Sequence, residues 1–233
     1  MKRIVLALAL PLLVSAHAQA ACNAAASESL VSSLVRQAPG LSANVLRLAM
    51  SASQCAAARG LVTRRDLLTV IDYSIASSKP RLFVFDLAAQ KLLYRELVAH
   101  GKNSGGDVAT SFSNDGGSLA SSIGLFVTAD TYFGHNGYSL RLRGLDEGFN
   151  DMAWDRLVVL HGASYVSEEA IRVLGRLGRS WGCPAVRPEI AKKLIDLLRG
   201  GTAIFAYYPD AQYLAKSEFL PHGGSAPTVM AVR

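Results

Sequence analysis

Arg156-Leu-Val-Val-Leu-His-Gly162 and, after a spacer, Arg179-Ser-Trp-Gly-Cys-Pro184 are the two stretches that decide the fold. Residues 156–160 are mostly apolar and include two valines, which predicts a short buried strand that delivers His161 and Gly162 at its end. The second stretch has the Gly and Pro of a tight turn and holds Cys183 within that turn. We therefore expect a sheet that brings a histidine and a cysteine to one place.

Cys183 and His161 are the candidate nucleophile and base. A cysteine attacks as its thiolate, and an imidazole, with an unperturbed pKa of about 6.5, is the usual base. Gly182 lets the backbone approach a substrate carbonyl. We expect the N–H groups of Gly182 and Cys183 to form an oxyanion hole, where one donor is worth roughly 3–4 kcal/mol. The alternative is a buried histidine and an inert buried cysteine that do not touch.

The cysteine count points to one free thiol. The chain has 3 cysteines, an odd number, so at least one is left unpaired within the chain. Cys22 and Cys55 both lie in Ala-rich, helix-like surroundings and could pair in an oxidising compartment. Cys183 stands far from them in the sequence and is then left unpaired, for which catalysis is one reason.

Residues 1–20 have the order of a secretory signal peptide. Lys2 and Arg3 precede an apolar run, residues 4–14, that is too short for a membrane span, and Ala18-Gln-Ala20 is a cleavage site of the small-x-small type. Cleavage after Ala20 would lower the formal net charge from +6 to +4. It predicts a periplasmic or cell-envelope protein with no stable membrane span. A retained anchor and a lipoprotein modified at Cys22 are the alternatives.

Residues 62–210 predict a mainly β domain with helices, of the α+β class. The expected strands are 67–73, 81–86, 91–99, 123–128, 138–143, 156–160 and 202–208, and the expected helices are 167–174 and 188–198. Residues 21–61 predict a short helical segment before this domain, and residues 211–233 predict a loose C-terminal tail.

Composition and spacing exclude several classes of protein. With 50% hydrophobic residues the chain is not disordered, and no basic cluster is dense enough for nucleic acid. The mild positive charge suits an anionic polymer of the envelope. His100, His135, His161 and Cys183 lack the short spacings of zinc ligands, so no metal is expected. The acidic residues within 146–155 predict a solvated loop, because nothing singles out a glycosidase pair among them.

These motifs resemble a known family of enzymes. His161-Gly162, a spacer and Ser180-Trp-Gly-Cys183 resemble the catalytic segment of L,D-transpeptidases of the YkuD-like fold, and are closest to the murein L,D-transpeptidase catalytic-domain-like branch. Further runs of this kind are Ile71-Asp-Tyr-Ser74, Val98-Ala-His-Gly101, Ala109–Asn114 and Gly175–Ser180. The resemblance covers about residues 66–208. The chain departs from better-known members at Trp181, where they have His, and at Ala185, where they often have Arg.

The resemblance implies a β-sandwich or barrel and a specific reaction. Cys183 would attack a stem peptide of peptidoglycan, His161 would act as the base, the Gly162 carbonyl would orient that histidine and Ser180 would brace the cysteine loop. D-Ala would leave, and an amine of a second stem would resolve the thioacyl-enzyme into a cross-link. No metal or organic cofactor is implied, and carbapenems should acylate Cys183. Alternatives are hydrolysis by an L,D-carboxypeptidase, an inactive wall-binding module, and another thiol enzyme such as a sortase-like transpeptidase or a periplasmic peptidase.

Five further residues are candidate substrate contacts. Tyr132 and His135 surround a Gly-rich turn, and Trp181 stands in the cysteine loop itself. Arg179 and Arg187 flank that loop and could bind substrate carboxylates bidentately. The alternatives are core packing for Tyr132 and His135 and solvated surface positions for the two arginines. The sequence leaves the oligomeric state open.

Overall fold

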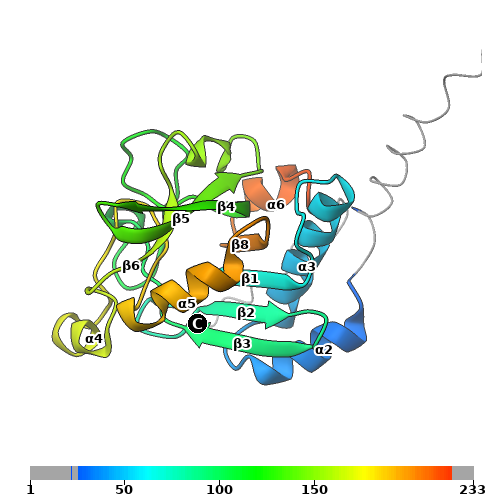
Figure 1. The fold of residues 1–233 in the computed structure, drawn as a ribbon, viewed down its shortest axis with the longest axis horizontal. Coiled ribbons are helices and arrows are strands. Elements are labelled where there is room, and N and C mark those ends of the chain that lie inside the picture. The colour runs from blue at the N-terminus through cyan, green and yellow to red at the C-terminus, as the bar shows by residue number, and fades with distance from the viewer. Residues whose placement is uncertain (1–21, 23–25, 222–233) are drawn as a thin grey trace, which may run out of the picture.

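A computed structural model describes residue 22 and residues 26–221, which form one eight-stranded sheet with helices around it (Figure 1). The helices are α2 (Glu28–Gln37), α3 (Ala43–Ala58), α4 (Glu168–Leu174), α5 (Pro188–Leu198) and α6 (Ala211–Lys216), with 3-10 turns η1 (Lys102–Ser104) and η2 (Asp151–Ala153). The strands are β1 (Leu67–Asp72), β2 (Leu82–Asp86), β3 (Lys91–Glu96), β4 (Gly124–Gly134), β5 (Gly137–Gly144), β6 (Val159–Gly162), β7 (Ala185–Val186) and β8 (Ala203–Tyr207). The predicted signal peptide, residues 1–20, lies outside the described residues.

The sheet curls until its two edges come together. Its strand order is β3-β2-β1-β8-β4-β5-β6-β7, with β1–β8 and β6–β7 parallel and the other pairs antiparallel. Beyond β3, Ala99 forms an antiparallel bridge to Ala185 of β7, and Gly101 forms a parallel bridge to Ser180. This nearly closed, barrel-like sheet confirms the predicted fold class, mainly β with helices. It also places residues 98–101 directly behind the cysteine loop.

The N-terminal helices share their core with the sheet. Helices α2 and α3 cover the region of β1, β2 and β3 (Figure 1). Leu34 of α2 and Leu46 of α3 are fully buried in the same apolar cluster as Leu68 of β1. The α3 N-terminus is capped as its sequence suggests, since the Ser42 hydroxyl accepts a hydrogen bond from the Asn44 N–H at 3.2 Å. The helical segment therefore packs on the main core.

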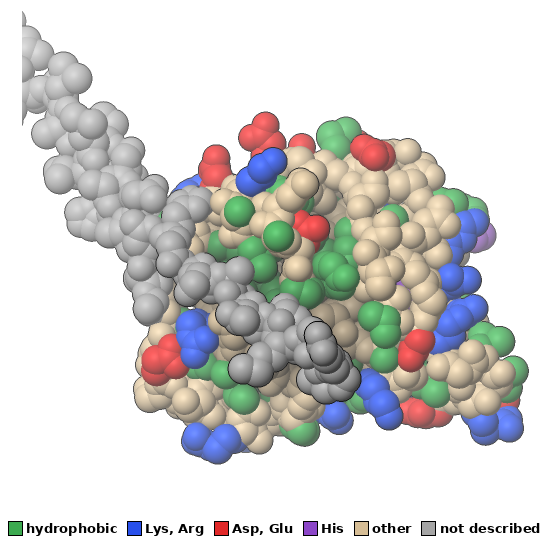
Figure 2. Space-filling view, turned by 180° about the vertical axis from the view of Figure 1, so that it is seen from behind, with side chains coloured by type: hydrophobic (Ala, Val, Ile, Leu, Met, Phe, Trp, Pro, Cys, Tyr) green, Lys and Arg blue, Asp and Glu red, His purple; other side chains and the backbone are tan. Residues whose placement is uncertain are grey.

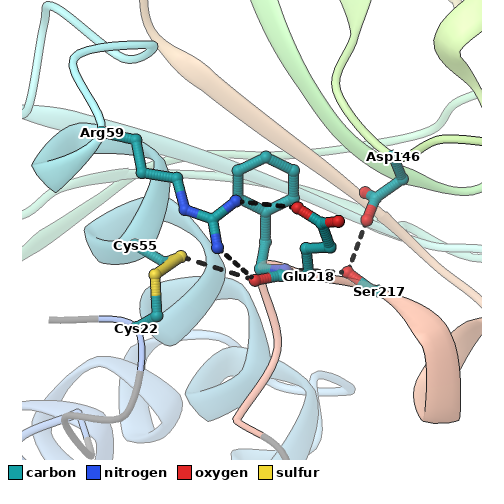
Figure 3. The surroundings of a disulfide bond; sticks show 7 residues. Cys22, Cys55, Arg59, Asp146, Ser217 and Glu218 are labelled. Carbon is teal, nitrogen blue, oxygen red and sulfur yellow. Dashed lines mark hydrogen bonds and ion pairs between the residues drawn. A yellow bond between two sulfur atoms is a disulfide. The ribbon is translucent and has the colours of Figure 1, made fainter. Parts of the chain in front are cut away.

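Cys22 and Cys55 form a disulfide at the edge of this core (Figure 3). The Cys55 sulfur lies 3.7 Å from the carbonyl oxygen of Glu218, and Arg59 of the same helix region pairs with the Glu218 carboxylate at 3.1 Å. The bond leaves Cys22 without the thiol that a lipoprotein would need. It ties the N-terminus to α3, next to the C-terminal segment.

Replacing both Cys22 and Cys55 with serine is expected to lower the free energy of unfolding by roughly 3–4 kcal/mol, because the disulfide closes a long loop. The two cysteines are 33 residues apart. Chemical denaturation of the wild type and the double variant measures the difference. A reducing agent should lower the stability of the wild type and leave that of the double variant unchanged. Equal stabilities of the two oxidised proteins would contradict the prediction.

Residues 211–220 are ordered, which corrects the loose tail predicted for this end of the chain. Helix α6 buries Tyr213, and the Ser217 hydroxyl that follows it donates to the Asp146 carboxylate at 2.5 Å (Figure 3). Burial raises the pKa of Asp146. Asp146 is therefore a buried acceptor, and the expectation of a solvated loop was wrong there. Its partner lies far along the chain, beyond the reach of a local pattern. Residues 222–233 lie outside the described residues.

Strand β6 starts and ends later than predicted. It runs from Val159 to Gly162, so His161 lies within the strand rather than after it. Residues 156–157 belong to the turn after η2, where Leu157 has a positive φ of 55° and a 63% exposed side chain. The shift has a physical reason, because Arg156 points its guanidinium into a polar cradle instead of joining the strand.

Candidate active site

Cys183 lies beside the strand that carries His161. Strands β6 and β7 are parallel, with His161 opposite Ala185. Continuing this register back by two residues places Cys183 opposite Val159, and the Val159 N–H donates to the Cys183 sulfur at 3.5 Å. The thiol also lies 3.8 Å from the Leu157 carbonyl oxygen, so Cys183 sits against the backbone of the segment that leads into the strand carrying His161.

The Ser180 side chain holds the turn around Cys183. Its hydroxyl accepts a hydrogen bond from the Gly182 N–H at 3.0 Å and donates to the Cys183 carbonyl at 2.6 Å. The backbone of Ser180 is fixed in turn, since its N–H donates to the His100 carbonyl at 2.9 Å and its carbonyl accepts from the Lys102 N–H at 2.8 Å. The cysteine loop is thus bonded to the segment behind it.

Gly182 is required at its position, and its N–H is already in use. Its φ is +126°, and a Cβ there would lie 2.8 Å from the Ala120 carbonyl oxygen. Because its N–H donates to Ser180, the two-donor oxyanion hole expected from Gly182 and Cys183 is not formed. Among the described residues nothing accepts a hydrogen bond from the Cys183 N–H, so this donor is not used within that part of the protein.

His161 is oriented by its own neighbour along the strand. The side chain is 3% exposed, and its Nδ1 lies 3.0 Å from the Gly162 carbonyl oxygen. A carbonyl only accepts hydrogen bonds, so Nδ1 carries the proton and Nε2 is left free to accept one. Burial lowers the pKa of His161 more than this hydrogen bond raises it. The imidazole is therefore neutral at pH 7, as a general base must be.

The thiol of Cys183 is also neutral at rest. Burial raises its pKa, while the Val159 N–H and the positive charge of Arg156 lower it to a smaller extent. The resting pair is thus a thiol and a neutral imidazole rather than a preformed ion pair. Such a pair can generate the thiolate by passing the proton to Nε2 of His161 when a substrate arrives.

Arg156 places a positive charge under the cysteine loop, and the sequence analysis missed this role. Its guanidinium is held by four uncharged acceptors, 2.6–3.1 Å away: the carbonyls of Ser113 and Ala120 and the hydroxyls of Ser118 and Ser122. A Cβ on Gly182 would lie 3.4 Å from its Nη2. Because no carboxylate pairs with it in this cradle, its charge acts on the nearby thiol. The one feature of the sequence that pointed to Arg156 is its position as a positive residue directly before the apolar residues 157–160.

Replacing Arg156 with methionine is expected to slow alkylation of Cys183 by iodoacetamide several-fold at neutral pH. The charge of Arg156 lowers the pKa of the Cys183 thiol, so its loss raises that pKa and leaves less thiolate. The difference between the two proteins should close as the pH rises above the thiol pKa. Mass spectrometry across a pH series measures the rates, since Cys22 and Cys55 are oxidised.

Arg156→Lys is the matched control for this experiment. It keeps the charge and loses the forked hydrogen bonds, so its pH profile should stay close to that of the wild type. The charge has no role if Arg156→Met is alkylated with the wild-type pH profile. If Arg156→Lys is alkylated as slowly as Arg156→Met, Arg156 acts by holding the loop and not through its charge.

A buried polar cluster supports the cysteine loop from behind. The Arg81 side chain is 0% exposed and donates to the carbonyls of Val98 and Ile75 at 2.8–3.0 Å, and to Nδ1 of His100 at 2.7 Å. Burial lowers the pKa of Arg81 to about 10, so it stays charged at pH 7. Burial and the charge of Arg81 lower the pKa of His100 to about 4, so His100 is neutral. Since the His100 carbonyl holds Ser180, the cluster positions the loop.

The three aromatic candidates lie in different surroundings. Trp181 is 77% exposed and stands directly next to Gly182 in the cysteine loop. Tyr132 of β4 pairs with Ser139 of β5, which in turn pairs with His161, so its side chain belongs to the catalytic face. His135 is exposed in the turn of the β4–β5 hairpin. Trp181 and Tyr132 are therefore placed near the site, and His135 lies at the hairpin tip.

The two arginines predicted to meet substrate carboxylates are bound within the protein. Arg187 forms a bidentate ion pair with Glu96, with contacts of 2.6–3.0 Å. Arg179 donates from Nη1 to the carbonyls of Lys102 at 3.1 Å and Gly105 at 2.8 Å. Arg187 thus ties the region of the cysteine loop to the end of β3, and Arg179 ties it to the residues after β3. The sequence placed them near Cys183, but it could not show that they already had partners.

Other kinds of site are not found in the part of the chain that the structure describes. Within residues 26–221 and Cys22, no three His, Cys, Asp or Glu side chains are grouped to hold a metal ion. None of the described helices is long and apolar enough to cross a membrane. On the face seen in Figure 2, Lys and Arg side chains lie mostly near the rim, with Asp and Glu among them.

Comparisons with solved structures return L,D-transpeptidases at low similarity. One, solved in complex with imipenem, has 17% identity and a TM-score of 0.39, covering 61% of this chain and 59% of that one. Another, from Mycobacterium smegmatis, has 14% identity, a TM-score of 0.39 and the same coverage. L,D-transpeptidase 1 from Mycobacterium tuberculosis has 15% identity and a TM-score of 0.35, covering 61% and 62%.

The family assignment rests on the sequence. No curated protein matches the chain. The aligned region spans about three fifths of the length of these solved structures. The model of the family described as the L,D-transpeptidase catalytic domain matches residues 37–207, which include every strand of the sheet and both His161 and Cys183. The chain belongs to the L,D-transpeptidase catalytic domain family.

Proposed function

We propose that this protein is a cysteine-dependent L,D-transpeptidase of the cell envelope that acts on stem peptides of peptidoglycan. One observation carries the proposal. Cys183 lies opposite Val159 of β6, and the same strand carries His161, whose Nε2 is free. A nucleophile with an oriented base beside it is the arrangement that acyl transfer requires. Membership of the family, which acts on peptidoglycan, supports the substrate class.

The reaction starts with proton transfer from the Cys183 thiol to Nε2 of His161. The thiolate then attacks the carbonyl carbon of the bond between the third residue of the stem and its terminal D-Ala. The Cys183 N–H stabilises the negative oxygen that forms. When the carbon–nitrogen bond breaks, the imidazolium returns the proton to the amine of D-Ala, which leaves. The product is a thioester between Cys183 and a tripeptide stem.

An amine of a second stem resolves the thioester. Neutral His161 takes a proton from this amine as it attacks the thioester carbonyl, and the Cys183 thiolate leaves and is reprotonated. The new amide joins the two stems. Water in place of the amine would give a free tripeptide. We expect the exposed Trp181, two residues before Cys183, to cover the peptide with its indole ring, in the place where better-known members of the family carry histidine.

Incubation with a purified disaccharide-tetrapeptide tests this proposal, with Cys183→Ala as the matched control. Chromatography and mass spectrometry should find a dimer that has lost one D-Ala, absent with the variant. A tripeptide without any dimer would make the enzyme an L,D-carboxypeptidase. If neither product forms and a carbapenem leaves no adduct on the wild type, the catalytic proposal fails and an inactive wall-binding module takes its place.

A further inference from the structure

Two arginines of β5 lie on the same face of the sheet as His161, next to the strand that Cys183 contacts. Arg141 pairs with Val159 of β6, and the Val159 N–H contacts the Cys183 sulfur. Arg141, Val159 and Cys183 thus occupy successive positions across three chain segments. With neighbouring strands about 4.8 Å apart, the Arg141 backbone is roughly 10 Å from that of Cys183. Arg143, two residues on, points to the same side.

Aromatic rings hold both guanidinium groups on this face. The Arg141 guanidinium carbon lies 4.6 Å from the ring centre of Tyr132 and 5.3 Å from that of Trp154. The Arg143 guanidinium carbon lies 5.1 Å from the same Trp154 ring. Each ring attracts the cation through its π-face. Stacking of this kind fixes a guanidinium in place without using the N–H donors at its edge.

Those N–H donors have no partner within the described part of the protein. No described carboxylate lies within 4.0 Å of Arg141 or Arg143, and no described acceptor forms a hydrogen bond with either. The other arginines around the site differ in this respect. Arg156, Arg179 and Arg187 all donate hydrogen bonds to other groups of the protein. Arg141 and Arg143 therefore keep their donors available to a ligand.

We propose that Arg141 and Arg143, held by Tyr132 and Trp154, form a subsite that binds carboxylates of the substrate peptide beside the bond under attack. The subsite rests on the proposed function, because a stem peptide approaching Cys183 is what brings carboxylates there. The two guanidinium groups share one Trp154 ring, 5.3 Å and 5.1 Å from its centre, so they present their charge together to one short peptide. Arginine recognises each carboxylate bidentately through paired N–H groups.

Equilibrium binding to the Cys183→Ala protein tests the subsite without requiring turnover. The probes are the disaccharide-tetrapeptide and the same compound with its carboxylates converted to amides. Relative to Cys183→Ala alone, addition of R141Q and R143Q should weaken binding of the free acid at least tenfold and change binding of the amide little. Arg36→Gln, at an exposed arginine on α2, is the control and should change neither. Lysine at 141 and 143 should restore part of the affinity.

Three outcomes would overturn the subsite. Binding of the free acid could be unaffected by the two glutamines, the two probes could lose affinity equally, or the variant could unfold at a lower temperature than the control and bind neither probe, even with lysine at both positions. Failure of the proposed function has a different signature. In that case the wild type would release no D-Ala from the tetrapeptide, whether or not Arg141 and Arg143 bind its carboxylates.

Discussion

Replacing His161 with glutamine is expected to slow formation of the thioacyl-enzyme roughly 10²–10⁴-fold, which is the usual contribution of a positioned base. Glutamine fills similar space but cannot take the thiol proton. Since the pKa of Cys183 is raised by burial, little thiolate exists without a base. Rapid-quench measurement of D-Ala release in a single turnover isolates the acylation step.

The pH dependence of the same step gives an independent check. A general base works in its neutral form, so acylation should fall as the pH drops through the pKa of His161. Burial lowers that pKa from 6.5, so the acid limb of the wild type should lie below pH 6.5. His161→Gln should lose this limb. A variant that keeps the wild-type rate, or a wild-type limb above pH 6.5, would contradict the role assigned to His161.

Replacing Arg81 with methionine is expected to lower the free energy of unfolding by roughly 3–5 kcal/mol, because it leaves buried acceptors without donors. The carbonyls of Val98 and Ile75 and Nδ1 of His100 all lose their partner at once. The side chain is fully buried, so water cannot replace these bonds without opening the core. Denaturant titration measures the loss.

Arg36→Met is the matched control for this measurement, since Arg36 is exposed on α2 and should change stability by less than about 0.5 kcal/mol. Because the His100 carbonyl holds the cysteine loop, Arg81→Met should also reduce turnover in the fraction that stays folded. A methionine variant as stable as the wild type would show that a buried charge at this position costs as much as its hydrogen bonds contribute.

The architecture was largely predictable, because local patterns record it. The strands that contain Thr69, Val84 and Ile204 are rich in β-branched residues and are bounded by turn residues. Ser42 and Ser167 cap the helices that follow them. Local patterns could not show closure of the sheet through Ala99 and Ala185, which depends on contacts between distant segments. The order of residues 211–220 was missed for the same reason.

The candidate site also has features that the sequence shows and features that only the fold shows. A histidine after an apolar run and a cysteine in a Gly-Pro turn are visible in the sequence, and the resemblance to a family singled them out. The partners of the arginines are not visible. The sequence suggests that Arg187 meets substrate, but Arg187 binds Glu96, whereas nothing in the sequence singles out Arg141, which has free donors. Whether an arginine is occupied depends on acceptors that only the fold brings near, as in the cradle of Arg156.

The most direct test of the central claim is the mass of the enzyme during turnover. The wild type, mixed with disaccharide-tetrapeptide and quenched in acid within the first turnover, should gain the mass of the substrate less D-Ala. Proteolytic mapping should find that mass on the peptide containing Cys183, as a thioester that hydroxylamine removes. An adduct on another residue, or product formation by Cys183→Ala at the wild-type rate, would contradict the account.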